Sequence, residues 1–217
     1  RVRGNPFLEI SHIINADLRW EWYLSEMDNL SVALFYKDMD KPIERVVQAA
    51  SGTAGNTRTF QNSDSAALYG VELDGRFEFI LGEGYDQTLF FAFNAAFIES
   101  EVTANNQEDR SLQGQPEYTA NLIFGYDHVS AGHQLTVLLN QNGKSIADVG
   151  VSGQPDVFLE PRLDLNVIYR FGISDSLTLK AKLENLLDDE IEYTQGGQIF
   201  QVYNRGPSIQ VGLDWQF

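Results

Sequence analysis

Nine residues near the N-terminus decide the fold: Ile14-Asn15-Ala16-Asp17-Leu18-Arg19-Trp20-Glu21-Trp22. Apolar and polar residues alternate at every position of this stretch. A helix would scatter the two sets around its circumference, whereas a β-strand points successive side chains to opposite faces. The stretch therefore predicts a strand with one apolar face and one polar face.

The same period of two recurs along nearly the whole chain and predicts about nine strands. The predicted strands centre on residues 14–22, 30–36, 69–79, 89–97, 118–126, 135–139, 163–171, 177–183 and 209–217. Strands of soluble sheets average about five or six residues, whereas a tilted membrane-spanning strand needs about nine to eleven. Several of the predicted strands reach the second length, which favours strands that cross a membrane.

The connections between the predicted strands alternate in length. Short turns rich in Gly, Ser and Asp are expected at residues 24–28, 81–86, 129–133 and 172–176. Long polar links are expected at residues 49–63, 103–115, 147–158 and 187–204. Short turns on one side and long loops on the other are typical of bacterial outer-membrane barrels. Aromatic residues at the ends of the apolar faces, such as Trp20 and Tyr126, fit the aromatic girdles of such barrels.

We therefore predict an all-β fold, the wall of an antiparallel up-and-down transmembrane β-barrel. The alternative is a soluble β-sandwich, which also alternates apolar and polar residues. Uniformly long strands and the strict order of short and long connections disfavour it.

Composition excludes several other classes of protein. The net charge of −16 argues against nucleic-acid binding, which needs an excess of Lys and Arg. No cysteine is present, so neither a disulfide framework nor a thiolate metal site is possible. No apolar stretch approaches the roughly 20 residues of a membrane-spanning helix. The chain opens on Arg1 rather than Met, so we expect it to be part of something longer.

The last eight residues, 210–217, resemble the assembly signal of outer-membrane barrels. The matching positions are a polar residue at Gln210, a small one at Gly212 and aromatic ones at Trp215 and Phe217. An edge strand of this kind can pair with the barrel-assembly machinery before the barrel closes. The simpler alternative is a strand that happens to end the chain.

Several stretches resemble the C-terminal barrel region of TonB-dependent outer-membrane receptors. The stretches are Gly4-Asn5-Pro6, residues 15–23 and 33–38, Pro42-Ile43-Glu44, residues 69–72, 115–122 and 184–188, and residues 203–207. Together they span essentially all 217 residues. Gly206-Pro207 departs from the pattern, because many members have Arg after this Gly.

The resemblance implies that residues 1–217 form the last part of a plugged barrel of about 22 strands, with the plug and the earlier strands upstream. It places Phe217 at the periplasmic rim, the short turns in the periplasm and the long links outside the cell. The expected partners are outer-membrane lipid, the barrel-assembly machinery and the TonB energy-coupling complex, which acts through the plug region and its TonB box. The expected cargo is a scarce solute such as a metal chelate or a sugar, imported without covalent chemistry, enzyme activity or a cofactor. A passive pore or a hydrolase on the barrel rim is the alternative.

Few residues suggest other chemistry. The three histidines are His12, His128 and His133; the last two flank a turn, and we expect them to be solvated rather than metal-bound. The acidic run Asp188-Asp189-Glu190 with Glu192 has two interpretations, a calcium or lipopolysaccharide-bridging site and a solvated loop, and the second is favoured. Charges expected on the polar face would pair with one another, contact the plug or line the solute path. They are Asp17, Arg19, Glu72, Asp74, Arg76, Arg162, Asp164 and Arg170.

Overall fold

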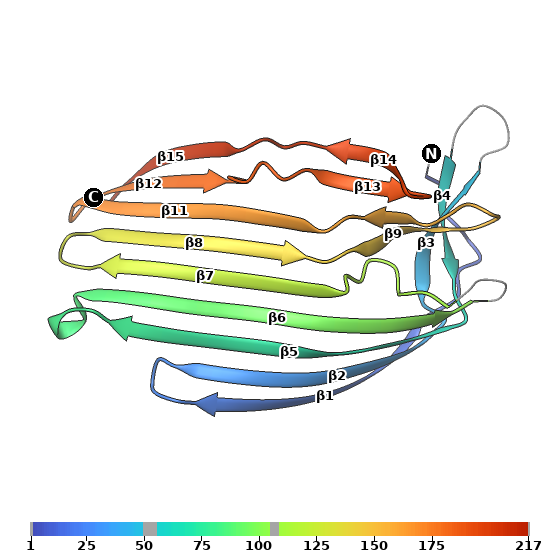
Figure 1. Cartoon of the computed structure of the whole chain (residues 1–217), viewed down its shortest axis with the longest axis horizontal. Helices are drawn as coiled ribbons and strands as arrows, with labels where there is room; N and C mark the ends of the chain where they lie inside the picture. The colour runs from blue at the N-terminus through green and yellow to red at the C-terminus, as the bar shows by residue number, and fades with distance from the viewer. Residues whose placement is uncertain (1, 50–55, 105–108, 217) are drawn as a thin grey trace.

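The computed structural model describes residues 2–49, 56–104 and 109–216, and Figure 1 shows the whole chain. These residues form two sheets of nine and six strands, here called the wall and the cap sheet. The described residues include one short 3₁₀ turn, Glu83–Tyr85. Among them, no helix has both the length and the apolar character that crossing a membrane requires.

The wall is an antiparallel meander, and each of its strands corresponds to one of the nine predicted strands. Its strands, in spatial order, are β1 (His12–Tyr23), β2 (Asn29–Asp40), β5 (Ser65–Ile80), β6 (Gln87–Thr103), β7 (Tyr118–His128), β8 (His133–Asn142), β11 (Arg162–Ser174), β12 (Leu177–Glu184) and β15 (Ser208–Trp215). The four short turns gather at the left end of the wall in Figure 1, and the cap sheet lies at the other end. The predicted strand order and turns are confirmed.

Strand register gives the wall one polar and one apolar face. Directly paired residues make a polar row across neighbouring strands, and this row defines the inner face: Ser31, Asp74, Asn94, Asn121, Asn140 and Asp164. The opposite, outer face carries an equally continuous apolar row: Leu18, Leu34, Val71, Phe97 and Tyr118. Leu18, Leu34 and Phe97 are more than half exposed, as expected for a surface that meets lipid rather than water.

The long links are not loops throughout, and here the sequence-based prediction was wrong. The cap sheet runs in the order β14-β13-β10-β9-β3-β4. Its strands are β3 (Ile43–Ala49), β4 (Asn56–Asn62), β9 (Ser145–Gly150), β10 (Val157–Leu159), β13 (Ile191–Gln195) and β14 (Gln198–Tyr203). Apart from β3, which precedes the first of them, these strands fall largely within the links predicted at 49–63, 147–158 and 187–204. The cap strands have only three to seven residues each, so a period of two cannot be distinguished in them from loop sequence.

The cap sheet is joined by one parallel pairing. Val46 and Val47 of β3 pair with Val149 and Gly150 of β9, which lies about 100 residues further along the chain. In Figure 1, β3 and β4 run across the ends of the wall strands, while β13 and β14 continue the direction of β12 and β15. Three long connections of the wall, those between β2 and β5, β8 and β11, and β12 and β15, therefore form one hydrogen-bonded sheet.

Two small apolar clusters replace a single core. Met39, Ala66 and Val102 lie at the cap end of the inner face and pack against Leu68 and Leu112. In the cap sheet, a second cluster joins β3 to β9 through Val46, Ile146 and Val149 and reaches Phe158.

One glycine of the wall is required by close packing. A Cβ atom built on Gly125 would lie 1.8 Å from the Phe90 ring. Arg76 covers the same ring, with its guanidinium carbon 5.0 Å from the ring centroid. Gly125 therefore makes room for an aromatic ring on the inner face.

Candidate functional site

Polar side chains on the inner face form a hydrogen-bonded chain. The Nη2 atom of Arg19 donates to Ser31 at 2.8 Å, and Ser31 donates to Asp74 at 3.2 Å. Asn94 donates to the other oxygen of Asp74 at 2.7 Å, and Asn121 donates to Asn94 at 3.4 Å. Two of the charges predicted on this face, Arg19 and Asp74, are thus linked, and their side chains lie 3.4 Å apart.

The remaining inner-face charges are less completely paired. Arg76 lies 3.5 Å from Glu78, and Arg162 lies 3.6 Å from Asp164. Asp164 Oδ1 and Arg162 Nε are buried without a hydrogen-bond partner among the described residues. Within the same residues, the side chains of Asp17, Glu72 and Arg170 make no hydrogen bond or ion pair.

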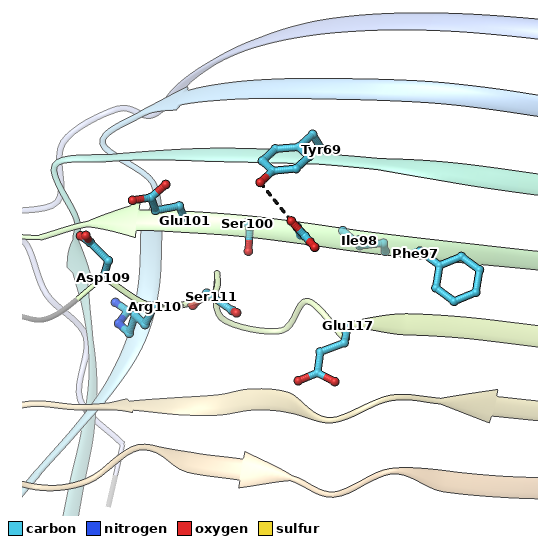
Figure 2. Close-up of a pocket in the computed structure, with 10 residues that line it drawn as sticks. Tyr69, Phe97, Ile98, Ser100, Glu101, Asp109, Arg110, Ser111 and Glu117 are labelled. Carbon is cyan, nitrogen blue, oxygen red and sulfur yellow. Dashed lines mark hydrogen bonds between the residues drawn. The ribbon is translucent and has the colours of Figure 1, made fainter.

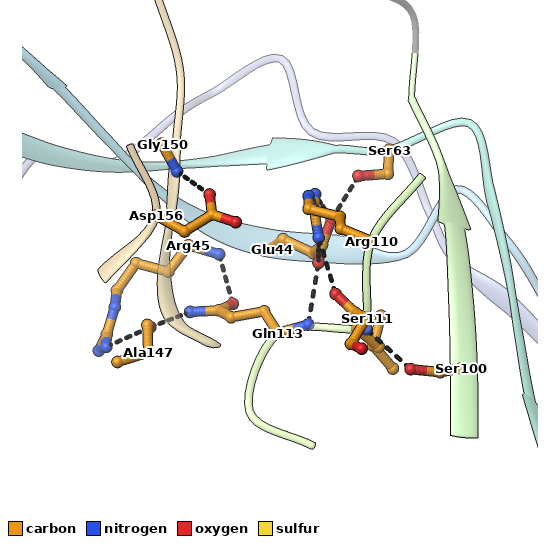
Figure 3. Close-up of polar contacts among 11 residues, drawn as sticks. Glu44, Arg45, Ser63, Ser100, Arg110, Ser111, Gln113, Ala147, Gly150 and Asp156 are labelled. Carbon is orange, nitrogen blue, oxygen red and sulfur yellow. Dashed lines mark hydrogen bonds and ion pairs between the residues drawn. The ribbon is translucent and has the colours of Figure 1, made fainter. Parts of the chain in front are cut away.

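A buried ion pair fixes β3 to the segment that follows β6. Arg110 donates from both Nη atoms to the Glu44 carboxylate, at 2.8 and 2.7 Å. The backbone N–H of Gln113 donates to Glu44 at 3.1 Å, and the Ser63 hydroxyl also donates to it. Glu44 is only 2% exposed and Arg110 12%. Figure 3 shows Glu44 at the centre of these contacts.

The pKa of Glu44 reflects opposing influences. Burial raises the pKa and is the largest single influence, but the hydrogen bonds from Arg110 and Ser63, the charge of Arg110 and the Gln113 N–H together hold the pKa below its ordinary value. The carboxylate is therefore ionised at neutral pH and the pair with Arg110 is intact.

The segment 109–115 lies over the inner face of the wall. Ser100 and Val102 share the inner face with Asn94, because they are separated from it by even numbers of residues. Ser100 accepts the backbone N–H of Leu112 at 2.8 Å, and Val102 packs against Leu112. The Glu44 side chain points toward this segment, and the Arg45 side chain leaves β3 on the other face. Gln113 of the segment also reaches Arg45, since it accepts the Arg45 N–H at 2.7 Å and donates to the Ala147 carbonyl at 2.6 Å.

On that other side of β3, two arginines share one carboxylate. Asp148 of β9 is 1% exposed and accepts hydrogen bonds from Arg45 Nε and, at 2.7 Å, from Arg58 Nε. Arg45 Nη2 also donates to the Ala147 carbonyl at 2.8 Å. The Phe200 ring lies over Arg58, with the ring centroid 5.9 Å from the guanidinium carbon. The cluster thus ties together β3, β4, β9 and β14.

Both arginines keep polar atoms free. Arg45 and Arg58 are 43% and 32% exposed. Among the described residues, Arg45 Nη1 and both Nη atoms of Arg58 have no hydrogen-bond partner. Asp148 therefore holds both side chains in place through their Nε–H groups and leaves other guanidinium N–H groups without a partner among these residues.

A cavity of about 660 Å³ opens beside the end of β6. Figure 2 shows its lining, in which the Tyr69 hydroxyl donates to Glu99 at 3.1 Å. Glu99 and Glu101 share the outer face with Phe97, and Asp109 and Glu117 add further carboxylates. A smaller cavity of about 220 Å³ adjoins it, and Lys144 and Phe158 contribute to its lining. Across the described part of the chain, no cluster of three or more His, Cys, Asp or Glu side chains is arranged to hold a metal ion.

His128, His133 and the acidic run make contacts with side chains or backbone of the same chain. His128 lies 3.3 Å from Asp86, and the His133 ring nitrogen Nδ1 lies 2.7 Å from the Tyr169 hydroxyl. In the acidic run, Asp189 accepts the Leu163 N–H at 2.7 Å. This contact caps the beginning of β11, which is a structural role.

The residues of the predicted assembly signal lie on the free edge of the wall. Gln210, Gly212 and Trp215 belong to β15, whose other edge pairs with β12. Gln210 donates to Glu184 at 2.9 Å, and the space beside Gly212 is open to at least 4 Å. Phe217 lies outside the described residues. The role of these residues in assembly stays a prediction.

Sequence reasoning did not single out Arg45, Arg58 or Asp148, and it noted Glu44 only as part of a resemblance. Their partners are far away in the sequence, 103 residues in the case of Arg45 and Asp148.

Comparison with known proteins gives consistent matches. The family model described as TonB dependent receptor-like, beta-barrel, matches residues 1–186. The iron-regulated outer membrane virulence proteins of two Vibrio cholerae strains are 25% and 26% identical over 226 residues. Those matches cover 100% of this chain and 32% of each relative, so the chain spans about a third of the length of these curated relatives.

Solved structures show the same fold. The siderophore receptor PirA from Acinetobacter baumannii has a TM-score of 0.68 at 17% identity, covering 100% of this chain and 33% of that one. A mutant of the ferric enterobactin receptor PfeA from Pseudomonas aeruginosa has a TM-score of 0.63 at 17% identity, with the same coverage. The outer membrane transporter YddB from Escherichia coli has a TM-score of 0.66 at 12% identity, covering 97% and 33%.

Proposed function

Because this chain belongs to the TonB-dependent receptor-like β-barrel family and is integral to the outer membrane, we propose that it is the C-terminal barrel part of an active transporter. The transporter binds a scarce solute on its extracellular side and imports it with energy delivered through TonB. The match over residues 1–186 carries this proposal.

The family assignment supports a proposed orientation of the chain. Bacterial outer-membrane barrels have short turns in the periplasm and longer connections outside the cell. The cap sheet is therefore extracellular, and the inner face of the wall lines the lumen. Solute arriving from outside meets the cap sheet before it reaches the lumen.

The proposed solute is a ferric chelate of the siderophore kind. The relatives are named as iron-regulated, and two of the similar solved structures are named as siderophore or ferric enterobactin receptors. Extracellular arginines on the cap sheet suit an anionic chelate. A sugar or another metal complex is the alternative cargo, and the aromatic residues Tyr193, Phe200 and Tyr203 of β13 and β14 are where it would be expected to bind.

The proposed partners follow from the position of each face. Lipid covers the apolar outer face, and the barrel-assembly machinery engages β15 through Gln210, Gly212, Trp215 and Phe217. The TonB energy-coupling complex acts through a plug region, which we place together with earlier barrel strands upstream of residue 1. The polar inner face is the surface that such a plug would contact.

Covalent chemistry has no part in the proposal. A passive pore or a rim hydrolase gains no support from the described residues, where His12 lies exposed at the start of β1 without a hydrogen-bonded Ser or Asp side chain. The imported iron is cargo and not a cofactor.

Uptake by the full-length receptor tests the proposal. A strain lacking its own siderophore receptors is given the full-length gene and a panel of radioactive ferric siderophores under iron starvation. We expect uptake of at least one chelate, and loss of that uptake when TonB is deleted. Uptake that persists without TonB would indicate a passive pore, and absence of uptake for every chelate would refute the siderophore assignment.

A further inference from the structure

We propose that Arg45 and Arg58, held by Asp148, form an oxyanion-binding site on the cap sheet that takes a negatively charged oxygen group of the imported solute. The inference rests on the proposed function and deepens it, because it names the residues and the charge of the solute. The chemical class is an anionic ferric chelate with carboxylate or phenolate oxygens at its surface.

Hydrogen bonds to Asp148 fix both guanidinium groups before any solute binds. Each donates its Nε–H to a different oxygen of Asp148, and Arg45 also donates to the Ala147 carbonyl. Arginine side chains lose considerable rotamer freedom when a ligand orders them. Here the ordering precedes binding, which leaves more of the interaction energy for the ligand.

The polar atoms that remain free suit an oxyanion. Guanidinium Nη groups match the spacing of carboxylate oxygens and donate charge-assisted hydrogen bonds. Arg45 Nη1 and the two Nη atoms of Arg58 make no hydrogen bond within the described part of the chain, and both side chains are partly exposed. The Phe200 ring beside Arg58 adds an apolar surface next to the charge.

The charge balance also favours an anion. Two arginines face one carboxylate, so the cluster has a local excess of one positive charge. The chain as a whole carries −16, but charges farther away than about 8 Å are largely screened at physiological salt. By contrast, Arg110 is only 12% exposed and its Nη atoms are bound to Glu44, which makes that pair a structural contact.

The position of the cluster fits a first contact with solute. Arg45 extends away from Arg110, while the Gln113 side chain accepts the Arg45 N–H at 2.7 Å and shares the Ala147 carbonyl with the Arg45 guanidinium (Figure 3). The side chains of Glu44 and Arg45 leave β3 on opposite faces, as neighbouring residues of a strand do. Glu44 thus anchors one face of β3 to Arg110, and Arg45 on the opposite face is the residue that contacts solute.

Equilibrium binding to the purified full-length receptor tests the inference. The probes are an anionic ferric tris-catecholate and an uncharged ferric tris-hydroxamate, followed by quenching of tryptophan fluorescence. We expect the double variant Arg45→Gln/Arg58→Gln to bind the anionic chelate about tenfold to a hundredfold more weakly, as for the loss of charged hydrogen bonds. Binding of any uncharged chelate that the receptor accepts should be unchanged.

Matched variants separate recognition from structure. Lys144→Gln removes a similarly exposed cation that pairs with Glu160, and it should leave the affinity for the anionic chelate unchanged. The double variant Arg45→Lys/Arg58→Lys keeps both charges beside Asp148 but loses the forked donors. It should bind with intermediate affinity, and it decides the question if the glutamine variant does not reach the outer membrane.

Each outcome has a distinct meaning. Equal affinity of the wild type and both double variants for the anionic chelate would overturn the inference while the proposed function stands. Equal weakening for charged and uncharged chelates would assign the arginines a structural role and overturn it as well. If the variants lose only co-purifying lipopolysaccharide, the site binds lipid phosphate and the inference is wrong. Binding of anionic chelates without TonB-dependent uptake would instead remove the proposed function and leave the site.

Discussion

Replacement of Glu44 by glutamine should loosen the cap sheet from the wall. The change keeps the size of the side chain but removes the charge that Arg110 faces. Glu44 is 2% exposed and Arg110 12%, so solvent screens the pair very little. Removal of one partner of a buried ion pair costs about 3 to 5 kcal/mol, because the other charge stays buried without compensation.

The lower end of that range applies to Glu44→Gln. The amide of the substituted side chain would still offer one oxygen to an Arg110 Nη atom, so we expect a loss of about 3 kcal/mol. Since about 1.4 kcal/mol corresponds to a factor of ten, the open form of the cap sheet should become about a hundredfold more populated. Hydrogen exchange measured by mass spectrometry on the full-length receptor in detergent reports this population. The peptides to follow cover β3 and residues 109–116.

The pH dependence provides an internal check. The folded pKa of Glu44 lies below its ordinary value of 4.5, so its contribution to stability is fully present above that value. The contribution is lost as the pH falls from there through the lowered folded pKa. The protection of these peptides, expressed relative to the slower intrinsic amide exchange in acid, should therefore fall below about pH 4.5 in the wild type, and the variant should lack this component.

Glu101→Gln is the matched control, because it removes an exposed carboxylate from the outer face near the same end of the wall. We expect it to leave the exchange of both peptides unchanged. If the exchange rate of these peptides rises less than about threefold in Glu44→Gln, or rises equally in the control, the argument from the buried ion pair is refuted.

Three further changes probe the wall. Gly125→Ala should lower the fraction of folded receptor in a heat-modifiability gel, because its Cβ would lie 1.8 Å from the Phe90 ring, and Phe90→Ala in the same chain should restore it; lack of rescue would contradict the packing. Val137→Lys on the outer face should cost about 2 to 4 kcal/mol in urea titrations, as a charge near the middle of the bilayer does. Thr136→Lys on the inner face should cost less, and equal costs would mean that the faces are assigned wrongly. Phe217→Ser should lower the amount of receptor in the outer membrane, whereas Gln216→Ser should not, and equal amounts would count against the assembly signal.

The sequence was sufficient for the wall because its strands are long and alternate without interruption. Residues 14–22 alone distinguish two faces, and the register pairs the apolar Leu18, Trp20 and Trp22 with Leu34, Val32 and Leu30 of the neighbouring strand. The cap sheet could not be predicted in this way. β10 has only three residues and β13 five, which is too short for a period to be recognised.

The candidate site was not predictable from local pattern at all. Glu44 and Arg110 are 66 residues apart, and Arg45 and Asp148 are 103 residues apart. Only the pairing of β3 with β9 brings Arg45 and Asp148 together. The assembly signal shows the opposite case, since it was recognised from adjacent residues and its role is still a prediction.

Because β3 and β9 pair in parallel, a change in one of these two strands of the cap sheet affects the other. A peptide tag inserted within either strand would disturb the partner strand as well, so the exposed segments cannot diversify independently. The tight turns at Gly153 and Gly197 are different, because both glycines have positive φ and no neighbouring atom within 4 Å of an added Cβ. Surface-display insertions, and the sequence variation that escapes antibodies or phages, should concentrate at these two turns.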